Sequence, residues 1–283
     1  MPLWLALSLL SALAWGVGQI VIKSALARFC PSIAYFVVSL VNIFVVSLLA
    51  LVSGRVTLDY LPLVLALSLL ACLGRVFYYQ AAERAPMSLV GTVVASYPMF
   101  TAILAAIFLG EATTAVQKAC IGLAIGGTVM MSWAPERLAA GSVSLMSWLP
   151  MSLMTAIAFG AGGFLSKWGV VEAGGLTFML GASLNQIWIS GLWLLRSGGA
   201  SGWSWTDRGL PILLVGAVLF TIGSLSVFLA LETGPSSLVF PVSNGCTLVT
   251  LLLAYLLLRE KLALLQWAGA VITSIGIIWI GWG

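Results

Sequence analysis

The chain has 283 residues, of which 61% are hydrophobic and 7% are charged, and its formal net charge is +4 with no histidine. So few polar side chains cannot cover the surface of a water-soluble globular protein. The composition therefore excludes a soluble domain and indicates a protein that lies in a lipid bilayer.

Ten apolar runs predict ten membrane-spanning helices and an all-α fold. Crossing roughly 30 Å of hydrocarbon takes about 20 apolar residues, and Pro, Gly and most of the charged residues lie between the runs. The first run is too long for a signal peptide and no Lys or Arg precedes it, so we predict a permanent span. In chain order the runs lie at 3–25, 32–53, 60–82, 86–109, 114–133, 145–168, 174–195, 209–232, 235–258 and 263–282.

Part of the sequence occurs twice. The stretch AERAPMSLV at 82–90 returns with changes as LETGPSSLV at 231–239, which places Glu83 on Glu232 at an offset of 232 − 83 = 149. A second match, at an offset of 167 − 23 = 144, aligns ALAWGVGQIVIK (12–23) with AIAFGAGGFLSK (156–167). The first offset also pairs rare residues that shared apolarity does not explain: Pro86 with Pro235, Ser88 with Ser237, Thr101 with Thr250, Glu111 with Glu260, and Gln117 with Gln266.

The repeat predicts two five-helix units, at residues 1–138 and 139–283. Because five is odd, the second unit must cross the membrane in the opposite sense to the first. We therefore predict an inverted-topology repeat, with a pseudo-two-fold axis in the membrane plane and a cavity between the halves near the midplane. Two similar units of opposite orientation can exchange shapes, so a central site can open to either side in turn.

This layout resembles the drug/metabolite transporter superfamily, specifically its members with two EamA-type five-helix units. The resemblance covers nearly the whole chain and is carried by Ala-Trp-Gly at 14–16, Ala-Phe-Gly at 158–160, the Pro-x-Ser-Leu-Val pattern that opens the fourth and ninth spans, and LGE and LRE at 109–111 and 258–260. It implies a secondary transporter, not an enzyme. The implied substrate is a small metabolite, an amino acid or related amphipathic compound, exported across a bacterial inner membrane.

All eight acidic residues fall in loops or at predicted helix ends. Proton coupling usually needs a buried carboxylate or a histidine inside the membrane, and this chain has no histidine. We therefore expect a facilitator or exchanger rather than a proton-driven pump. Glu83 and Glu232 are candidate gate residues, because closure of the gates could bury them.

Arg75 is the one basic residue deep inside a predicted span. It lies about eight residues, or roughly 12 Å, from the end of that span, beyond the reach of a snorkelling side chain. Its planar guanidinium suits a substrate carboxylate. The structural alternative pairs it with Glu83 or with loop carbonyls. Its repeat equivalent is Ser224 (224 − 75 = 149), so a charge-selective site would be asymmetric.

The remaining basic residues predict orientation and span ends. Eight lie in the loops after odd-numbered spans and three on the other side, which places both termini outside by the positive-inside rule, whereas the resemblance implies cytoplasmic termini. Lys23 and Lys167 sit near the ends of repeat-related spans. Snorkelling to the membrane interface is the favoured interpretation for both, and a gating role is the alternative.

Polar and aromatic side chains of the repeat-related spans are the candidates for a substrate site. A polar group buried in hydrocarbon must bond to another helix or to a ligand, and interhelical bonding is the commoner outcome for any one residue. Among the aromatic residues, Trp15 and three tyrosines lie deep enough to contact a substrate. The predicted substrate-binding residues are Trp15, Gln19, Arg75, Tyr78, Tyr79, Tyr97, Phe159, Ser224, Ser243, Asn244 and Thr247.

Two prolines interrupt the fourth and ninth spans. Pro98 and Pro241 each free backbone carbonyls near polar side chains, which is typical of transporter sites. The repeat maps Pro98 onto Thr247 rather than onto Pro241, so we expect kinks at different depths in the two halves.

Other functions are less consistent with the sequence. An intramembrane enzyme would need paired acids, a Ser with His, or a metal-binding cluster, and none is visible in the spans. A flippase for a lipid-linked or amphipathic headgroup is the closer alternative.

The four cysteines show no paired spacing, so we expect no metal, disulfide or cofactor. The expected partners are a small-molecule substrate and the bilayer, with no nucleic acid. We expect Gly122-x-x-x-Gly126 to pack tightly inside a monomer, and a homodimer is the alternative.

Overall fold

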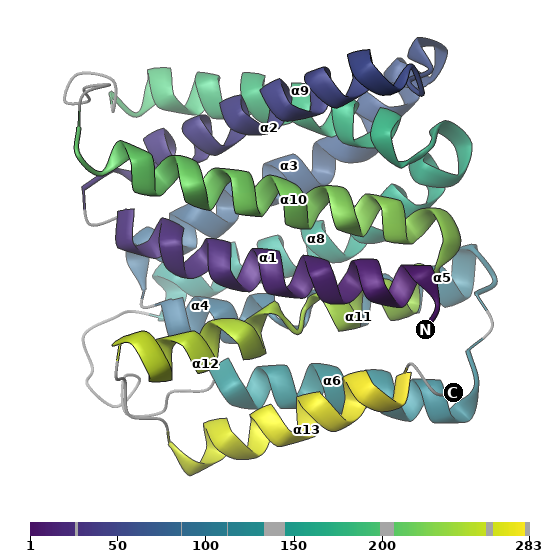
Figure 1. Cartoon of the computed structure of the whole chain (residues 1–283). Helices are drawn as coiled ribbons and strands as arrows, with labels where there is room; N and C mark the ends of the chain where they lie inside the picture. The colour runs from purple at the N-terminus through teal and green to yellow at the C-terminus, as the bar shows by residue number, and fades with distance from the viewer. Residues whose placement is uncertain are drawn as a thin grey trace.

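The computed structural model describes residues 1–25, 28–85, 87–111, 113–132, 145–198, 207–258 and 263–280, and every regular element in these ranges is a helix (Figure 1). The helices are α1 (Leu3–Ala25), α2 (Pro31–Ser53), η1 (Leu58–Tyr60), α3 (Leu61–Arg84), α4 (Met87–Val94), α5 (Tyr97–Phe108), α6 (Ala115–Ser132), α8 (Leu145–Ala173), α9 (Gly175–Arg196), α10 (Leu210–Thr233), α11 (Ser236–Ser243), α12 (Cys246–Leu258) and α13 (Leu264–Ile280).

The ten predicted spans are confirmed, and two of them are broken. The fourth span consists of α4 and α5, and the ninth consists of α11 and α12. Among the described residues, seven segments are long and apolar enough to cross a membrane, and Tyr97–Phe108, Ala115–Met131 and Leu264–Ile280 are shorter apolar helices. The sixth span continues five residues beyond its predicted end, to Ala173, with Pro150 inside the helix.

The burial pattern is that of a protein solvated by lipid. Large apolar side chains face outward, including Leu51 (83% exposed) and Leu195 (77% exposed), while Ser39 and Thr101 are fully buried. In water, such an exposed apolar surface would be an aggregation hazard, whereas hydrocarbon solvates it. The buried hydroxyls bond to carbonyls, as where Ser39 Oγ donates to Tyr35 O at 2.7 Å. The fold is therefore that of an integral membrane protein.

The inverted orientation of the two units is visible where helices α1 and α8 meet the same turn. A Cβ on Gly234 would lie 2.6 Å from Trp4 Cβ at the start of α1. Lys167 Nζ, close to the end of α8, donates to Gly234 O at 2.9 Å. Helix α1 thus begins at the face where its repeat equivalent α8 ends, which we call the terminal face because α1 begins and α13 ends there (Figure 1).

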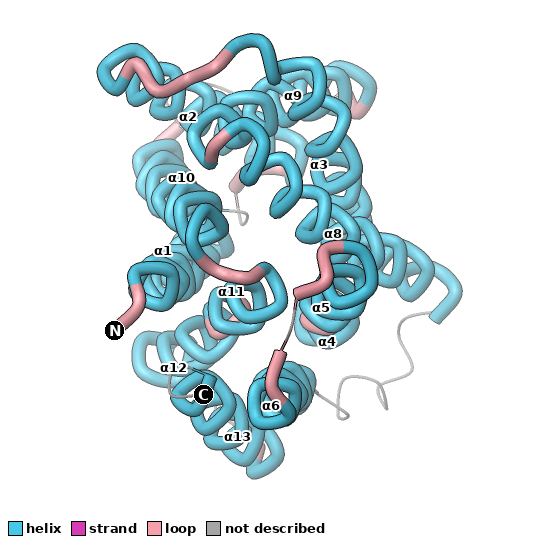
Figure 2. The backbone as a smooth tube through the Cα atoms, turned by 90° about the vertical axis from the view of Figure 1, so that its right-hand side faces the viewer, coloured by secondary structure: helices cyan, strands magenta, loops and turns pink. Residues whose placement is uncertain are grey.

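Three hydrogen bonds mark the pseudo-two-fold axis, because a residue can bond to its own repeat equivalent only where the axis passes. They run from Asn42 Nδ2 to Gln186 Oε1 (3.0 Å; 186 − 42 = 144), from Asn244 Nδ2 to Ala95 O (3.1 Å; 244 − 95 = 149) and from Thr273 Oγ1 to Ala124 O (3.5 Å; 273 − 124 = 149). The axis therefore passes between α2 and α9, between the breaks of the fourth and ninth spans, and between α6 and α13. Figure 2 shows α1 and α10 on one side of this line and α8 and α3 on the other.

Helix packing repeats across the axis. Helix α1 packs along α10 and crosses α12, and in the same way α8 packs along α3 and crosses α5. Gly16 and Gly160 allow the two crossings, since a Cβ would lie 2.5 Å from Val249 Cβ in the first and 2.4 Å from Phe100 Cβ in the second. These four residues are equivalent in pairs. The Ala-Trp-Gly and Ala-Phe-Gly motifs thus place a glycine where two helices approach closely.

The expected kinks at different depths are wrong. Helices α4 and α11 end at Val94 and Ser243, which are equivalent at 243 − 94 = 149. The two breaks therefore occupy the same repeat position although the prolines do not. Pro98 lies in the first turn of α5, where a missing N–H costs nothing, while Pro241 lies inside α11, just before its end.

The expected tight packing of Gly122 and Gly126 is also wrong. A Cβ on either residue would meet nothing within 4 Å. The close approach of α6 and α13 uses Gly127 and Gly276 instead, where a Cβ would lie 2.4 Å from Thr273 Oγ1 and 2.7 Å from Ala124 N. These two glycines face the axis, while the predicted pair faces outward.

Candidate functional site

Arg75 lies in the middle part of α3, between two aromatic rings from the other repeat. Its guanidinium carbon lies 4.6 Å from the centroid of the Phe220 ring on α10 and 5.8 Å from that of the Phe159 ring on α8. A cation over such ring faces is attracted to their negative electrostatic potential. The two rings attract the charge of Arg75, and neither offers a strong hydrogen-bond acceptor to its N–H groups.

Within the described part of the chain, no hydrogen bond and no ion pair is made by Arg75. Its guanidinium neither bonds to described loop carbonyls nor pairs with a described acid. The side chain of Glu83 lies outside the described residues. A guanidinium has five N–H donors, and leaving them unbonded inside a membrane is costly. An intramembrane charge of this kind makes Arg75 the first candidate for a functional residue.

Aromatic side chains continue the surface beside Arg75. Tyr78 lies one turn further along α3, with its ring centroid 6.5 Å from Phe159. Tyr97, at the start of α5, stands edge-on to Phe159 and to Phe240, with both centroid distances at 6.1 Å. The region between α3, α5 and α8 is therefore apolar and aromatic around a single charge.

Trp15 and Ser224 occupy the equivalent place in the other half. The Trp15 ring stacks on Phe220 at 5.8 Å, and its Nε1 donates to Phe220 O (3.2 Å) and to Ser224 Oγ (3.3 Å). Since Trp15 is equivalent to Phe159 and Ser224 to Arg75, the same contact joins an indole to a hydroxyl on one side and a phenyl ring to a cation on the other. We call the seven residues Trp15, Arg75, Tyr78, Tyr97, Phe159, Phe220 and Ser224 the central cluster.

Three other predicted site residues make structural contacts near this cluster. Gln19 Nε2 donates to Cys246 Sγ at 3.7 Å, and Gln19 Oε1 accepts a long bond of 3.5 Å from Thr250. Asn244 joins the two helix breaks through Ala95 on the axis. Thr247 lies just after the second break, where its N–H donates to Asn244 O at 3.1 Å. They hold the helix breaks in register beside the cluster.

The last two predicted site residues are Tyr79 and Ser243, and the Tyr79 ring stands edge-on to that of Tyr78 in the central cluster, with a centroid distance of 5.7 Å. Tyr79 points from α3 toward α2 and α9, with its ring 5.5 Å from Tyr35 and 5.9 Å from Trp193. Ser243 is fully buried, and its Oγ has no hydrogen-bond partner among the described residues. An unpaired buried hydroxyl at the end of α11 leaves one polar group available beside the break.

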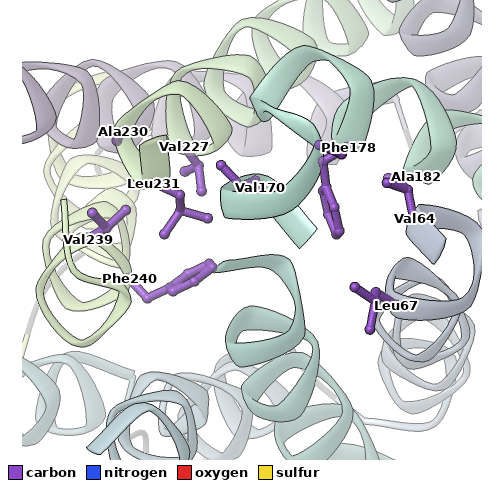
Figure 3. Packing of buried hydrophobic residues seen from close by; sticks show 11 residues of the cluster. Val64, Leu67, Val170, Phe178, Ala182, Val227, Ala230, Leu231, Val239 and Phe240 are labelled. Atoms are coloured by element: carbon purple, nitrogen blue, oxygen red, sulfur yellow. The ribbon is translucent and has the colours of Figure 1, made fainter. Parts of the chain in front are cut away.

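A hydrophobic cluster closes the terminal face above the central cluster. Side chains from α3, α8, α9, α10 and α11 converge there (Figure 3). The members of this terminal-face cluster are Val64, Leu67, Val170, Ala173, Phe178, Ala182, Val227, Ala230, Leu231, Val239 and Phe240. Phe240 links it to the substrate candidates, because the same ring contacts Tyr97.

At the opposite face, the described equivalents of these residues belong to two clusters, and the side chains of Leu26 and Ala82, the equivalents of Val170 and Leu231, lie outside the described residues. Val90, the equivalent of Val239, packs with Ala81 and Trp148, while Ala34, the equivalent of Phe178, belongs to a separate cluster. Phe240 is replaced by Gly91, where a Cβ would meet nothing within 4 Å. One apolar cluster packs at the terminal face, and the described part of its counterpart belongs to two clusters.

Charged side chains complete the terminal face by capping helix ends. Glu111 accepts hydrogen bonds from the start of α11, and Glu232 Oε1 accepts one from Gly175 N at 2.8 Å at the start of α9. Lys167 Nζ donates to Leu231 O at 2.7 Å at the end of α10. The Lys167 ammonium group thus reaches the helix-end carbonyls at this face, and its snorkelling to the membrane interface stays a prediction. The side chain of its equivalent Lys23 lies outside the described residues.

The family follows from comparison with known proteins. The model of the EamA-like transporter family matches residues 2–133 and 146–282. The chain belongs to this family. It is therefore a multi-pass membrane transporter of small solutes, within the drug/metabolite transporter superfamily.

Two individual proteins resemble this EamA-like transporter. An uncharacterized protein of Methanocaldococcus jannaschii is 42% identical over 69 residues, which make up 24% of this chain and 50% of that protein. The match thus spans half of that relative. A protein of known crystal structure shares 15% identity with a TM-score of 0.80, over 98% of this chain and 95% of its own. At that identity the likeness shows the fold alone.

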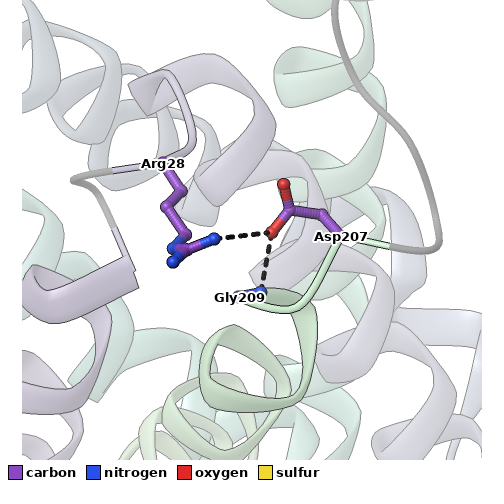
Figure 4. A network of polar contacts seen from close by, with 3 residues as sticks. All are labelled: Arg28, Asp207 and Gly209. Carbon is purple, nitrogen blue, oxygen red and sulfur yellow. Dashed lines mark hydrogen bonds and ion pairs between the residues drawn. The ribbon is translucent and has the colours of Figure 1, made fainter.

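The EamA-like transporter also carries a polar link at its opposite face. Arg28 Nη1 lies 4.0 Å from Asp207 Oδ1, which accepts a hydrogen bond from Gly209 N at 2.7 Å (Figure 4). The Arg28 side chain is 59% exposed, so water screens this pair. It ties the end of the first span to the start of α10 only weakly.

Two residues of the EamA-like transporter's central region were not among the predicted ones. Phe220, the ring nearest Arg75, lies one helical turn before Ser224 on α10, and that spacing could have indicated it. Phe240 could have been found because the repeat aligns this bulky residue with Gly91. Both were overlooked because an apolar ring in a membrane span carries no signal of its own.

Proposed function

We propose that this transporter moves a small carboxylate-bearing solute by alternating access, with Arg75 as the anchor for the carboxylate. The observation that carries the proposal is the unpaired guanidinium of Arg75 between Phe159 and Phe220. Its planar donor edge matches a carboxylate, and two parallel N–H to O bonds would satisfy both partners.

The surroundings of Arg75 favour a solute that carries an anionic group on an otherwise apolar molecule. The described acids, which are Asp59, Glu111, Glu172, Asp207 and Glu232, lie in loops or near helix ends, so no described carboxylate opposes Arg75. Rings of the central cluster would contact the rest of the solute, and they can also face an ammonium group. Amino acids and related amphipathic acids fit this description. Export across a bacterial inner membrane stays a prediction from the family resemblance.

Two features support alternating access: the two halves share a backbone arrangement, and their equivalent faces carry different side chains. The two halves repeat their packing across the axis, and Phe240 of the terminal-face cluster has Gly91 as its equivalent at the opposite face. A second state of similar energy follows if the halves exchange their arrangements, which would open the terminal face and seal the other.

Ligand-dependent thermal unfolding of the purified protein tests the proposal. The compounds are monocarboxylates, amino acids, amines, nucleosides and an amphipathic lipid headgroup, each measured against wild type, Arg75→Gln and the exposed control Arg28→Gln. A ligand at 100 times its dissociation constant stabilises the folded state by about 2.7 kcal/mol. We expect carboxylates to stabilise wild type and Arg28→Gln but not Arg75→Gln.

Two results would contradict the proposal. Equal stabilisation of Arg75→Gln by the same carboxylate would move the anchor elsewhere. Stabilisation by amines or by the lipid headgroup alone would favour the flippase alternative and remove the anion site.

A further inference from the structure

Glu111 bridges the two repeats with four hydrogen bonds. It follows α5 in the first repeat, and its carboxylate meets the first two residues of α11 in the second. Oε1 accepts from Ser236 N (2.8 Å) and Ser236 Oγ (3.0 Å), and Oε2 accepts from Ser237 N (2.9 Å) and Ser237 Oγ (2.7 Å). Each carboxylate oxygen thus takes one amide and one hydroxyl.

The contact supplies what the start of α11 lacks. The first N–H groups of a helix have no partner inside the helix, and Pro235, the residue before α11, has no side chain that could cap them. A carboxylate also interacts favourably with the positive end of the helix dipole, and charge-assisted bonds are stronger than neutral ones. The cap of α11 therefore comes from the other half of the molecule.

A second charged group lies beside this contact. Lys167 holds the end of α10 through Leu231 O and Gly234 O, and its positive charge interacts with Glu111. The turn between α10 and α11 is thereby fixed to α8 by Lys167 and to the α5–α6 connection by Glu111. Val239 and Phe240 of the terminal-face cluster follow directly after the capped residues.

We infer that Glu111 is a latch that keeps the terminal face closed, and that opening this face requires its four bonds to break. The inference rests on the proposed alternating access, in which the α5–α6 region and α11 separate at this face. While Glu111 is bound, α11 stays against the first repeat and the terminal-face cluster stays sealed. The latch sets how often the face opens and does not contact the solute.

The sequence repeat supplies a matched control. Glu260 and Ser88 are the equivalents of Glu111 and Ser237 by sequence. Glu260 and the side chain of Ser88 lie outside the described residues, so Glu260→Gln serves as a charge-removing variant in the same motif that leaves the Glu111 contact intact.

Cysteine accessibility tests the latch without any substrate. Val239→Cys reports on the terminal face and Val90→Cys, its equivalent, on the opposite face; both positions are fully buried. The four native cysteines are replaced first. Glu111→Gln should raise the rate of maleimide labelling at Val239→Cys about tenfold, as expected for the loss of charge-assisted bonds, and should not raise it at Val90→Cys. The double variant Ser236→Ala/Ser237→Ala keeps the backbone bonds and should raise it about threefold.

Three outcomes would overturn the inference. Glu111→Gln and the double serine variant could both leave Val239→Cys labelling unchanged in folded protein. Glu111→Gln could raise labelling equally at both reporters, which would mean general loosening rather than a latch. Glu260→Gln could raise Val239→Cys labelling as much as Glu111→Gln does. Each leaves the carboxylate anchor at Arg75 testable by thermal unfolding, because labelling uses no ligand.

Discussion

The two faces of this transporter share a backbone plan and differ in their side chains. At the terminal face Phe240, Val239 and the Glu111 contact hold α11 in a single cluster with four other helices. At the opposite face Gly91 stands where Phe240 would be, and the equivalent apolar residues that the structure describes belong to two clusters. A duplicated backbone therefore carries different side chains at its two faces, and under the proposed alternating access these side chains would decide which face is closed.

Phe240 and Gly91 should respond most differently to substitution. Phe240→Ala should lower the free energy of unfolding by about 3 kcal/mol, because it removes a buried ring that joins the terminal-face cluster to Tyr97. Gly91→Ala should change it by less than about 0.5 kcal/mol, since its Cβ meets no atom within 4 Å. Unfolding in mixed micelles with increasing SDS measures both. Equal losses would contradict the assigned difference between the faces.

Gly16 and Gly160 should behave alike, because their crossings are related by the axis. Leucine at either position would overlap Val249 or Phe100 and should cost about 1–3 kcal/mol in unfolding free energy. The same unfolding measurement applies, with Gly122→Leu on the outer side of α6 as a neutral control. A large loss at one crossing and none at the other would contradict the equivalence.

Thr101 and Thr250 provide a finer test of the same symmetry. Thr101 Oγ1 donates to Gly160 O at 2.9 Å, and Thr250 Oγ1 donates to Gly16 O at 3.2 Å. Valine at either position keeps the shape and removes the bond, so each variant should lose about 1 kcal/mol. If Thr250→Val alone were neutral, the longer bond would have no energetic role.

The smallest effect is expected at the exposed ion pair of the opposite face. Arg28→Ala removes the 4.0 Å contact with Asp207 and should change the unfolding free energy by less than about 0.5 kcal/mol. High salt should likewise change the unfolding free energy of the wild-type protein by less than about 0.5 kcal/mol. A loss above 1 kcal/mol would show that this face is held more firmly than its contacts indicate.

The sequence predicted the fold because its signals are local or repeated. Apolar length sets each span, and matches such as Glu83 with Glu232 reveal the duplication. The odd number of helices per unit then fixes the inversion. The boundary between the units stays a prediction at residues 138 and 139, which lie outside the described residues.

The sequence did not predict contacts that depend on side-chain direction. Pro98 and Pro241 indicated breaks but not their equivalent positions, because proline restricts a helix without fixing where it ends. Tyr79 contacts Tyr78 as its neighbour, and its other ring contacts are with Tyr35 and Trp193, which lie far away in the sequence. Lys167 and Glu111 both bond to residues more than 60 positions away, and nothing in their neighbourhood indicates those partners.

The most direct test of alternating access is to lock the terminal face closed. Glu111→Cys/Ser237→Cys in a cysteine-free protein places two thiols on either side of the contact between Glu111 and Ser237, and a short bifunctional methanethiosulfonate reagent can bridge them. Transport of a carboxylate found in the thermal screen is then measured in proteoliposomes, before cross-linking, after cross-linking and after reduction of the cross-link, with each single variant as a control. We expect transport to fall to background on cross-linking and to return on reduction. Undiminished transport by fully cross-linked protein would contradict it.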